Sequence, residues 1–198
     1  MTRRRLGVGA ILLVVALAVG YLYAGTVIYD KLSIAHPGCS QDVRTQTPAA
    51  FTLKKEDPRP YLMPHYEAVT IPSRDSGISL SSWWIPADTS TGAPAVVIVH
   101  GLDSCKRASD ILLAAGMLHR HGFSVLLFDM RNHGDSTIQN GRYAGGTKEY
   151  KDALGAWDWV VGTRGIKPEH VGMMGFSLGA ATALIASGEE PRVAATWE

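Results

Sequence analysis

The stretch VGMMGFSLG, residues 171–179, joins two segments of different character. The apolar run 171–176 predicts a short buried strand, and the alanine-rich run 178–186 predicts a helix. The glycines allow a turn too tight for a Cβ on either side of Ser177, which would then lie at the carboxyl edge of a sheet, beside a helix N-terminus. A Gly-x-Ser-x-Gly pattern at a strand-to-helix junction is typical of a nucleophile elbow, and a glycine-rich turn with an incidental serine is the alternative.

Apolar runs on both sides of this stretch predict the rest of the fold. Strands are expected at 66–72, 78–86, 95–99, 123–129 and 192–197, and helices at 109–120 and 147–161. Two strands followed by strand–helix alternation predict an α/β fold, with a mostly parallel sheet and helices on both of its faces.

The N-terminus has the features of a membrane segment. Three arginines at positions 3–5 precede an uncharged run over 6–29, which as a helix would be about 36 Å long and could cross a hydrocarbon core of about 30 Å. The arginines should stay in the cytoplasm, so we expect a single-pass anchor in the cell membrane and an extracytoplasmic domain. A secretory signal cleaved near Ala-Leu-Ala at 16–18, which would release the domain, is the alternative.

The domain organisation follows from these segments and from composition. We expect a basic cytoplasmic N-terminus over 1–5, a transmembrane helix over 6–29, a proline-containing extracytoplasmic linker over 30–65 and an α/β core over 66–198. The linker would be a stalk or an extension lying on the core. The formal charge is +1, and no basic stripe follows position 5, so we expect no nucleic-acid partner.

The two cysteines, Cys39 and Cys105, are too few for a disulfide framework or a zinc knuckle. Whether they are free or paired stays open at this point. Lys106 and Arg107 could lower the pKa of the Cys105 thiol, but no histidine or carboxylate partner can be placed beside it. A catalytic thiol is therefore not expected.

A second element of chemistry follows the strand 95–99. In an acyl-transfer site, the loop His100-Gly101-Leu102 would supply one donor of an oxyanion hole through the Leu102 amide. The second donor would be the amide of Leu178, directly after Ser177. We expect His100 to be structural, packed under the loop, and not to act as the catalytic base.

A third motif, DMRNHGDS at 129–136, follows the strand 123–129. Together with the His-Gly loop and the Gly-Phe-Ser-Leu-Gly turn, in this order and spacing, it resembles the α/β-hydrolase superfamily over about residues 66–198. The pattern is most similar to bacterial membrane-anchored hydrolases related to serine aminopeptidases, esterases and acylglycerol lipases. Asn132 stands where that family commonly has glycine, and asparagine tolerates the positive φ of such a turn.

The resemblance implies roles for individual residues. Ser177 would be the nucleophile of a serine hydrolase that cleaves a carboxylic ester, or a thioester or amide, through an acyl-enzyme. Leu102 and Leu178 would hold the oxyanion. The motif residues expected to be structural are His100, Gly101, Asp129, Arg131, His133, Gly134, Gly175 and Gly179. No metal or cofactor is implied, and the substrate would be a small or lipid-like acyl compound.

The acid and base of a catalytic triad are missing from this sequence. In this family they follow the serine, but the 21 residues after Ser177 contain neither histidine nor aspartate. We therefore expect the N-terminal part of a hydrolase, whose activity by itself is doubtful and which a C-terminal chain could complement. An inactive membrane-anchored binding module or a gene relic is the alternative. The strand from Arg192 would be an open edge, so the chain alone should be prone to aggregation.

Overall fold

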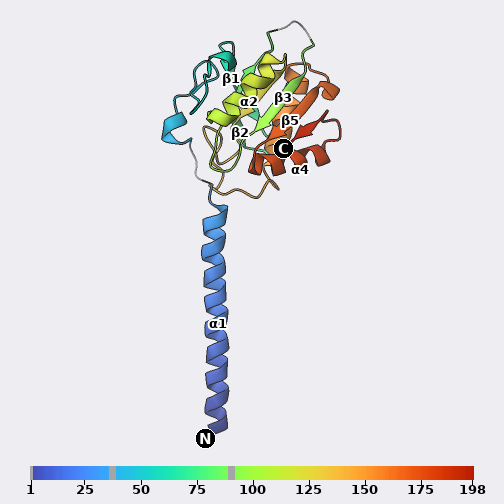
Figure 1. Ribbon diagram of the computed structural model, residues 1–198. Helices are drawn as coiled ribbons and strands as arrows, with labels where there is room; N and C mark the ends of the chain where they lie inside the picture. The colour runs from blue at the N-terminus through green and yellow to red at the C-terminus, as the bar shows by residue number, and fades with distance from the viewer. Residues whose placement is uncertain (1, 36–38, 89–91) are drawn as a thin grey trace. The chain divides into compact units, whose positions relative to one another are not determined.

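The computed structural model describes residues 2–35, 39–88 and 92–198. It divides into two compact units, one ending at Ile34 and the other spanning Ala35–Glu198. Each unit is described separately below (Figure 1).

The first unit is a single helix, α1, over Thr2–Ser33. An 18-residue window within its segment Val8–Ser33 has a mean hydropathy of 2.3 and no buried residue, so the segment is long and apolar enough to cross a membrane. A signal sequence near the N-terminus has the same properties. The helix continues past residue 29, where the predicted span ends, and includes Asp30 and Lys31.

The second unit is built on one mixed sheet of strand order β1-β2-β4-β3-β5-β6. Strand β2 pairs antiparallel with β1 on one side and with β4 on the other, whereas β4, β3, β5 and β6 are mutually parallel. The strand bounds are β1 Glu67–Pro72, β2 Ser79–Ile85, β3 Ala95–Val99, β4 Ser124–Phe128, β5 Val171–Gly175 and β6 Thr196–Trp197. The fold is thus the α/β class that the alternation predicts.

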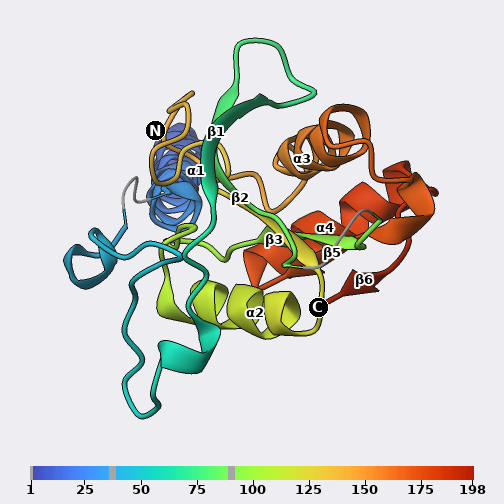
Figure 2. The same cartoon turned by 90° about the horizontal axis from the view of Figure 1, so that it is seen from above.

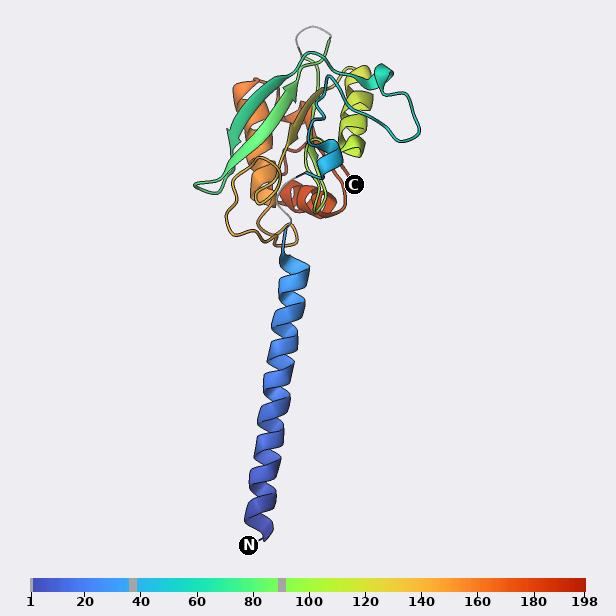
Figure 3. The same cartoon turned by 90° about the vertical axis from the view of Figure 1, so that its left-hand side faces the viewer.

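Helices cover both faces of this sheet. Helix α2 (Ser109–Arg120) lies on one face, and α3 (Tyr150–Thr163) and α4 (Leu178–Glu189) lie on the other (Figure 2). Figure 3 shows the same arrangement from the side, with α3 in orange and α2 in yellow-green. The described residues also form the short 3-10 helices η1 Gln41–Val43, η2 Arg59–Tyr61 and η3 Pro168–His170.

Two apolar cores stabilise the sheet, one on each face. The first packs Trp157 and Leu154 of α3 against Phe128 and its neighbours. The second packs α2 against the opposite face of the sheet. Phe51 and Met63, from the segment expected to be a linker, are buried in this second core. Much of that segment is therefore part of the domain and is not a free stalk.

Local ion pairs and caps explain where the predicted element ends differ from the observed ones. Helix α3 begins at Tyr150 and not at 147, because the Glu149 carboxylate accepts the amides of Ala144 (2.8 Å) and Gly146 (3.0 Å) and closes a turn there. Strand β6 is only two residues long, because Arg192 lies in a turn with Glu190, where the Nε–Oε1 distance is 2.8 Å.

Candidate active site

Ser177 lies between β5 and α4 with a backbone that few residues other than glycine adopt. Its φ is 53° and its ψ is −116°. Such a conformation is costly and persists only where the surrounding structure imposes it. The side chain is exposed at the carboxyl edge of the parallel strands. Backbone strain and exposure at the same residue point to a chemical role.

The glycines on either side make this turn feasible. A Cβ at Gly175 would overlap the carbonyl of Gly179, and a Cβ at Gly179 would overlap the carbonyl of Val99 at the end of β3. Helix α4 therefore begins almost in contact with β3 and β5. Neither position has room for a side chain, as the tight turn predicted from the sequence requires.

The loop after β3 lies directly against the Ser177 turn. A Cβ at Gly101 would be 3.2 Å from the Phe176 carbonyl oxygen and 3.4 Å from the Ser177 Cβ. The Phe176 amide donates to the carbonyl of Val99 at 3.0 Å, which fixes the two segments side by side. The structure thus brings together the loop and the turn, which are about 75 residues apart in sequence.

The amides of Leu102 and Leu178 belong to these two segments. Leu178 is the first residue of α4, where the first amides of a helix have no intrahelical acceptor. Within the described part of the chain, neither amide donates to a protein acceptor.

His100 is completely buried beneath the same loop. Its Nδ1 donates to the Gly101 carbonyl at 2.7 Å, and its Nε2 accepts the Met130 amide at 3.0 Å. Burial lowers the pKa of this imidazole to about 4, so the ring is neutral at pH 7. Both nitrogens are engaged with backbone groups, an arrangement that suits a support for the loop and leaves neither nitrogen free to accept a proton from Ser177.

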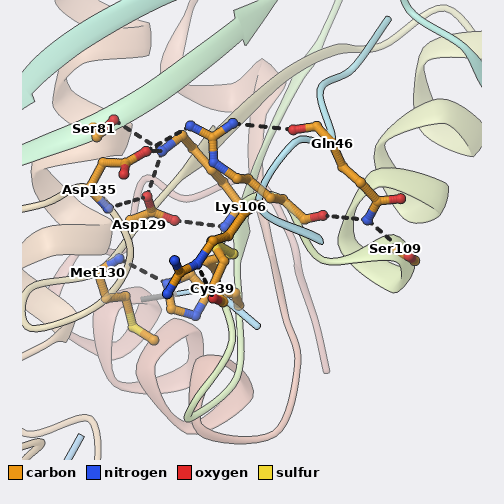
Figure 4. The surroundings of a disulfide bond; sticks show 12 residues. Cys39, Gln46, Ser81, Lys106, Ser109, Asp129, Met130 and Asp135 are labelled. Atoms are coloured by element: carbon orange, nitrogen blue, oxygen red, sulfur yellow. Dashed lines mark hydrogen bonds and ion pairs between the residues drawn. A yellow bond between two sulfur atoms is a disulfide. The ribbon is translucent and has the colours of Figure 1, made fainter. Parts of the chain in front are cut away.

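The motif at 129–136 forms a turn around a buried carboxylate. Asp129 accepts the Lys106 amide (2.7 Å), the Lys106 ammonium (2.5 Å) and the Asp135 amide (2.9 Å). A Cβ at Gly134 would overlap this carboxylate, so the position requires glycine. The turn and the loop after β3 are therefore held by one shared anion, Asp129 (Figure 4).

The other motif residues anchor this turn to the rest of the domain. The buried Arg131 guanidinium binds Asp152 of α3 and Asp75, each at 2.7 Å. Asn132 has a φ of 62°, as its place in the turn predicts. His133 bonds through Nδ1 with the Arg131 carbonyl at 2.9 Å, and its buried Nε2 has no partner among the described residues.

Sequence reasoning missed two features beside this site. Cys39 and Cys105 form a disulfide across a sequence separation of 66, which excludes Cys105 as a thiol nucleophile. Lys106 is buried, with 1% of its side chain exposed, and forms ion pairs with Asp129 and Asp135. No local sequence pattern predicts either feature, because the partners are distant in the sequence. Among the described residues, no group of three or more histidine, cysteine or acidic side chains could hold a metal ion.

Known proteins share this fold. A family model described as the alpha/beta hydrolase fold matches residues 94–196, which include the loop, the turn and the Ser177 segment. The chain belongs to the α/β-hydrolase family. An Aspergillus aculeatus thiohydrolase is 36% identical over 100 residues, which are 50% of this chain and 31% of the relative. An uncharacterized Mycobacterium tuberculosis protein is 31% identical over 136 residues, which are 67% of this chain and 45% of the relative.

Solved structures show the same fold. A Pyrococcus furiosus esterase superposes with a TM-score of 0.60 at 26% identity, covering 73% of this chain and 54% of the esterase. An α/β hydrolase from Penicillium superposes with a TM-score of 0.61 at 23% identity, covering 67% of this chain and 44% of the other, and this likeness concerns the fold alone. The chain spans less than half the length of the curated relatives it matches.

Proposed function

We propose that this chain carries the nucleophile and the oxyanion hole of a serine hydrolase that cleaves a carboxylic ester or thioester. The observation that carries the proposal is Ser177, exposed with a φ of 53° between two glycines that tolerate no Cβ. The neighbouring Leu102 and Leu178 amides, which have no acceptor in the described part of the chain, support it.

In the proposed reaction, the Ser177 hydroxyl attacks the acyl carbon and loses its proton to a base. The amides of Leu102 and Leu178 stabilise the oxyanion of the tetrahedral intermediate, aided by the N-terminus of α4. Collapse of the intermediate breaks the bond to the leaving group, which departs as an alcohol or thiol with that proton. Water then attacks the acyl-Ser177 ester and releases the carboxylic acid.

The base and its orienting carboxylate would come from polypeptide outside residues 1–198. In the family order, both follow the nucleophile in the chain. The buried and fully bonded His100 is a poor substitute. That the chain covers only 31–54% of the thiohydrolase, the M. tuberculosis protein and the esterase supports this part of the proposal. The missing residues would be in the same polypeptide or in a complementing C-terminal chain.

The substrate class follows from the relatives that have named activities. One is a thiohydrolase and another is an esterase, so an acyl ester or thioester, small or lipid-like, is the substrate we propose. An amide is the other bond that the same mechanism can break. No step of the proposed reaction needs a cofactor.

We also propose that α1 anchors the domain in the cell membrane, with the domain outside the cytoplasm. The apolar segment Val8–Ser33 supports the anchor. The disulfide between Cys39 and Cys105 supports the location independently, because such bonds persist mainly in oxidising compartments. A cleaved signal would give the same compartment with a released domain.

A binding module without turnover is the second candidate function. It is favoured by one observation: no described imidazole forms a hydrogen bond with Ser177. Such a module would keep the fold and the exposed edge of the sheet, and a folded protein whose Ser177 is unreactive would support it.

The two candidates are separated by the hydrolysis of acyl esters and thioesters of graded chain length by the protein expressed from its natural gene. We expect turnover that Ser177→Ala abolishes. The matched control is Ser187→Ala, a serine ten residues further on, within α4, which should retain activity. Equal turnover in wild type and Ser177→Ala, or none in a folded wild type, would contradict the proposal.

A further inference from the structure

The disulfide joins the N-terminal extension of the domain, residues 39–65, to the loop after β3, which carries Leu102. Cys105 lies three residues after Leu102, and Cys39 lies near the start of the compact unit. Both cysteines are buried. Figure 4 shows the bond beside the ion-pair network of Lys106 and Asp129. A covalent bond therefore fixes the loop from the side of the extension.

Hydrogen bonds and ion pairs fix the next residues of the loop from the side of the sheet. The buried Lys106 binds Asp129 through both its amide and its ammonium, and its ammonium also binds Ser81 of β2 at 3.0 Å. The adjacent Arg107 binds Asp135 at 2.8 Å. The loop is thus held at two neighbouring points by independent means.

The segment between these points and Leu102 contains a residue in an uncommon backbone conformation. Asp103, directly after Leu102, has a φ of 53°, a left-handed value that few residues with a side chain adopt, although aspartate adopts it more readily than most. Such conformations relax when the surrounding constraints are removed. Loss of the tether at Cys105 would therefore change the backbone near the Leu102 amide first.

The extension has its own attachments to the domain. Gln46 donates to the Arg107 carbonyl at 3.0 Å and to the Ser109 hydroxyl at 3.1 Å. Phe51 and Met63 are buried in the core under α2. Breaking the disulfide would therefore leave the extension docked and the fold intact, so its effect would be local to the loop.

We propose that the Cys39–Cys105 disulfide is a positioning element for the oxyanion hole, which holds the Leu102 amide in the orientation that acyl transfer needs. This proposal rests on the proposed function of Ser177. Reduction by a dithiol transfers two electrons and two protons to the disulfide, giving two cysteine thiols and a cyclic disulfide of the reductant. The hydrolase would then be fully active only in an oxidising compartment.

The test compares wild type with Cys39→Ala/Cys105→Ala, both as the full chain in detergent. Hydrogen–deuterium exchange should become faster in peptides covering 100–108 and stay unchanged in α3 and α4. Phe51→Leu is the matched control: it removes apolar volume from the core under α2 but keeps the disulfide and the ion pairs of Lys106, so it should leave exchange at 100–107, before Ala108, unchanged.

The second readout is the reaction of Ser177 with a fluorophosphonate and, where turnover is measurable, kcat and KM for an acyl ester. Loss of a whole oxyanion donor costs about 100- to 1,000-fold, so a loosened donor should lower the labelling rate and kcat by about 3- to 30-fold at unchanged KM. Phe51→Leu should leave both rates unchanged at temperatures where it is folded.

Two results would overturn the proposal: unchanged exchange at 100–108, or faster exchange with an unchanged rate at Ser177. A wild type that reacts with no probe would instead contradict the proposed function, and the exchange measurement would still decide whether the disulfide holds the loop. Unreactive wild type combined with unchanged exchange would contradict both.

Discussion

At the scale of single residues, Ser177 and His100 lie close to the same edge of the sheet in opposite environments. Ser177 is exposed, with no protein partner on its hydroxyl among the described residues, whereas His100 is completely buried with both ring nitrogens bonded. Exposure suits a group that must reach a substrate. Burial with both ring nitrogens bonded to backbone groups suits a neutral support, and it gives His100 a measurable titration signature.

Protonation of His100 should destabilise the fold at acid pH. Burial lowers its pKa to about 4 in the folded state, against about 6.5 when unfolded, so the unfolded chain binds more protons between these values. The contribution of His100 to stability is complete above pH 6.5 and falls by about 1.4 kcal/mol per unit as pH decreases toward 4.

Denaturant unfolding at several pH values checks this expectation. Between pH 6.5 and 4.5, the free energy of unfolding of His100→Gln should fall less steeply with decreasing pH than that of the wild type, by up to about 1.4 kcal/mol per pH unit. Identical slopes in the two proteins would contradict it. Carboxylates that form ion pairs, such as Glu190 with a pKa lowered to about 2 mainly by Arg192, lose their contribution at lower pH and do not distinguish the variants.

The residues of the candidate site could be predicted from the sequence only in part. The Gly-x-Ser-x-Gly pattern predicts the turn because only glycine fits two residues before and two residues after Ser177, a local requirement. The Lys106–Asp129 ion pair and the disulfide could not be predicted, because their partners are 23 and 66 residues apart and only the assembled sheet brings them together.

At the scale of elements, periodicity predicted strand β3 and helix α2 with the observed bounds. Both have unambiguous patterns: a buried β-branched run and one apolar stripe that ends at His121-Gly122. Helix α3 and strand β6 start later than predicted, because Glu149 and Glu190 bind backbone amides or a nearby arginine and hold local turns. A hydropathy pattern does not predict such side-chain hydrogen bonds and ion pairs.

Helix α4 begins so close to β3 that its first turn tolerates no added methyl group. Gly179→Ala should lower the free energy of unfolding by about 2–4 kcal/mol and abolish the proposed reactivity of Ser177, since a Cβ there would overlap the Val99 carbonyl.

Gly188→Ala is the matched control in the same helix, because a Cβ at Gly188 meets no atom within 4 Å. It should leave stability unchanged or raise it by up to about 1 kcal/mol. Thermal or denaturant unfolding of both variants gives the comparison, and equal stabilities for the two would rule out the close contact between α4 and β3.

At the scale of the whole domain, helix α2 covers only part of its face of the sheet and leaves a groove toward β5 and β6. An apolar groove of about 700 Å³ lies there, lined by residues that include Met117, Phe123, Met174 and Trp197. Trp197 is 69% exposed on the short strand β6 at the edge of the sheet. Exposed apolar surface beside an open strand edge promotes association between copies.

Residues 35–198 expressed without α1 should therefore associate or aggregate. Size-exclusion chromatography with light scattering should show oligomers or loss of soluble protein, and Trp197→Lys should reduce the association. A monomeric wild-type fragment that unfolds in one cooperative thermal transition would contradict this expectation.

We propose that Ser177 is an activated nucleophile in an oxyanion hole formed by backbone amides. The most direct test is mass spectrometry of the natural protein after exposure to a fluorophosphonate probe, with heat-denatured protein and Ser177→Ala in parallel. We expect one phosphonyl group on the peptide containing Ser177 in the native sample and none in either control. A folded native protein that remains unmodified, or that carries the adduct on another residue, would contradict it.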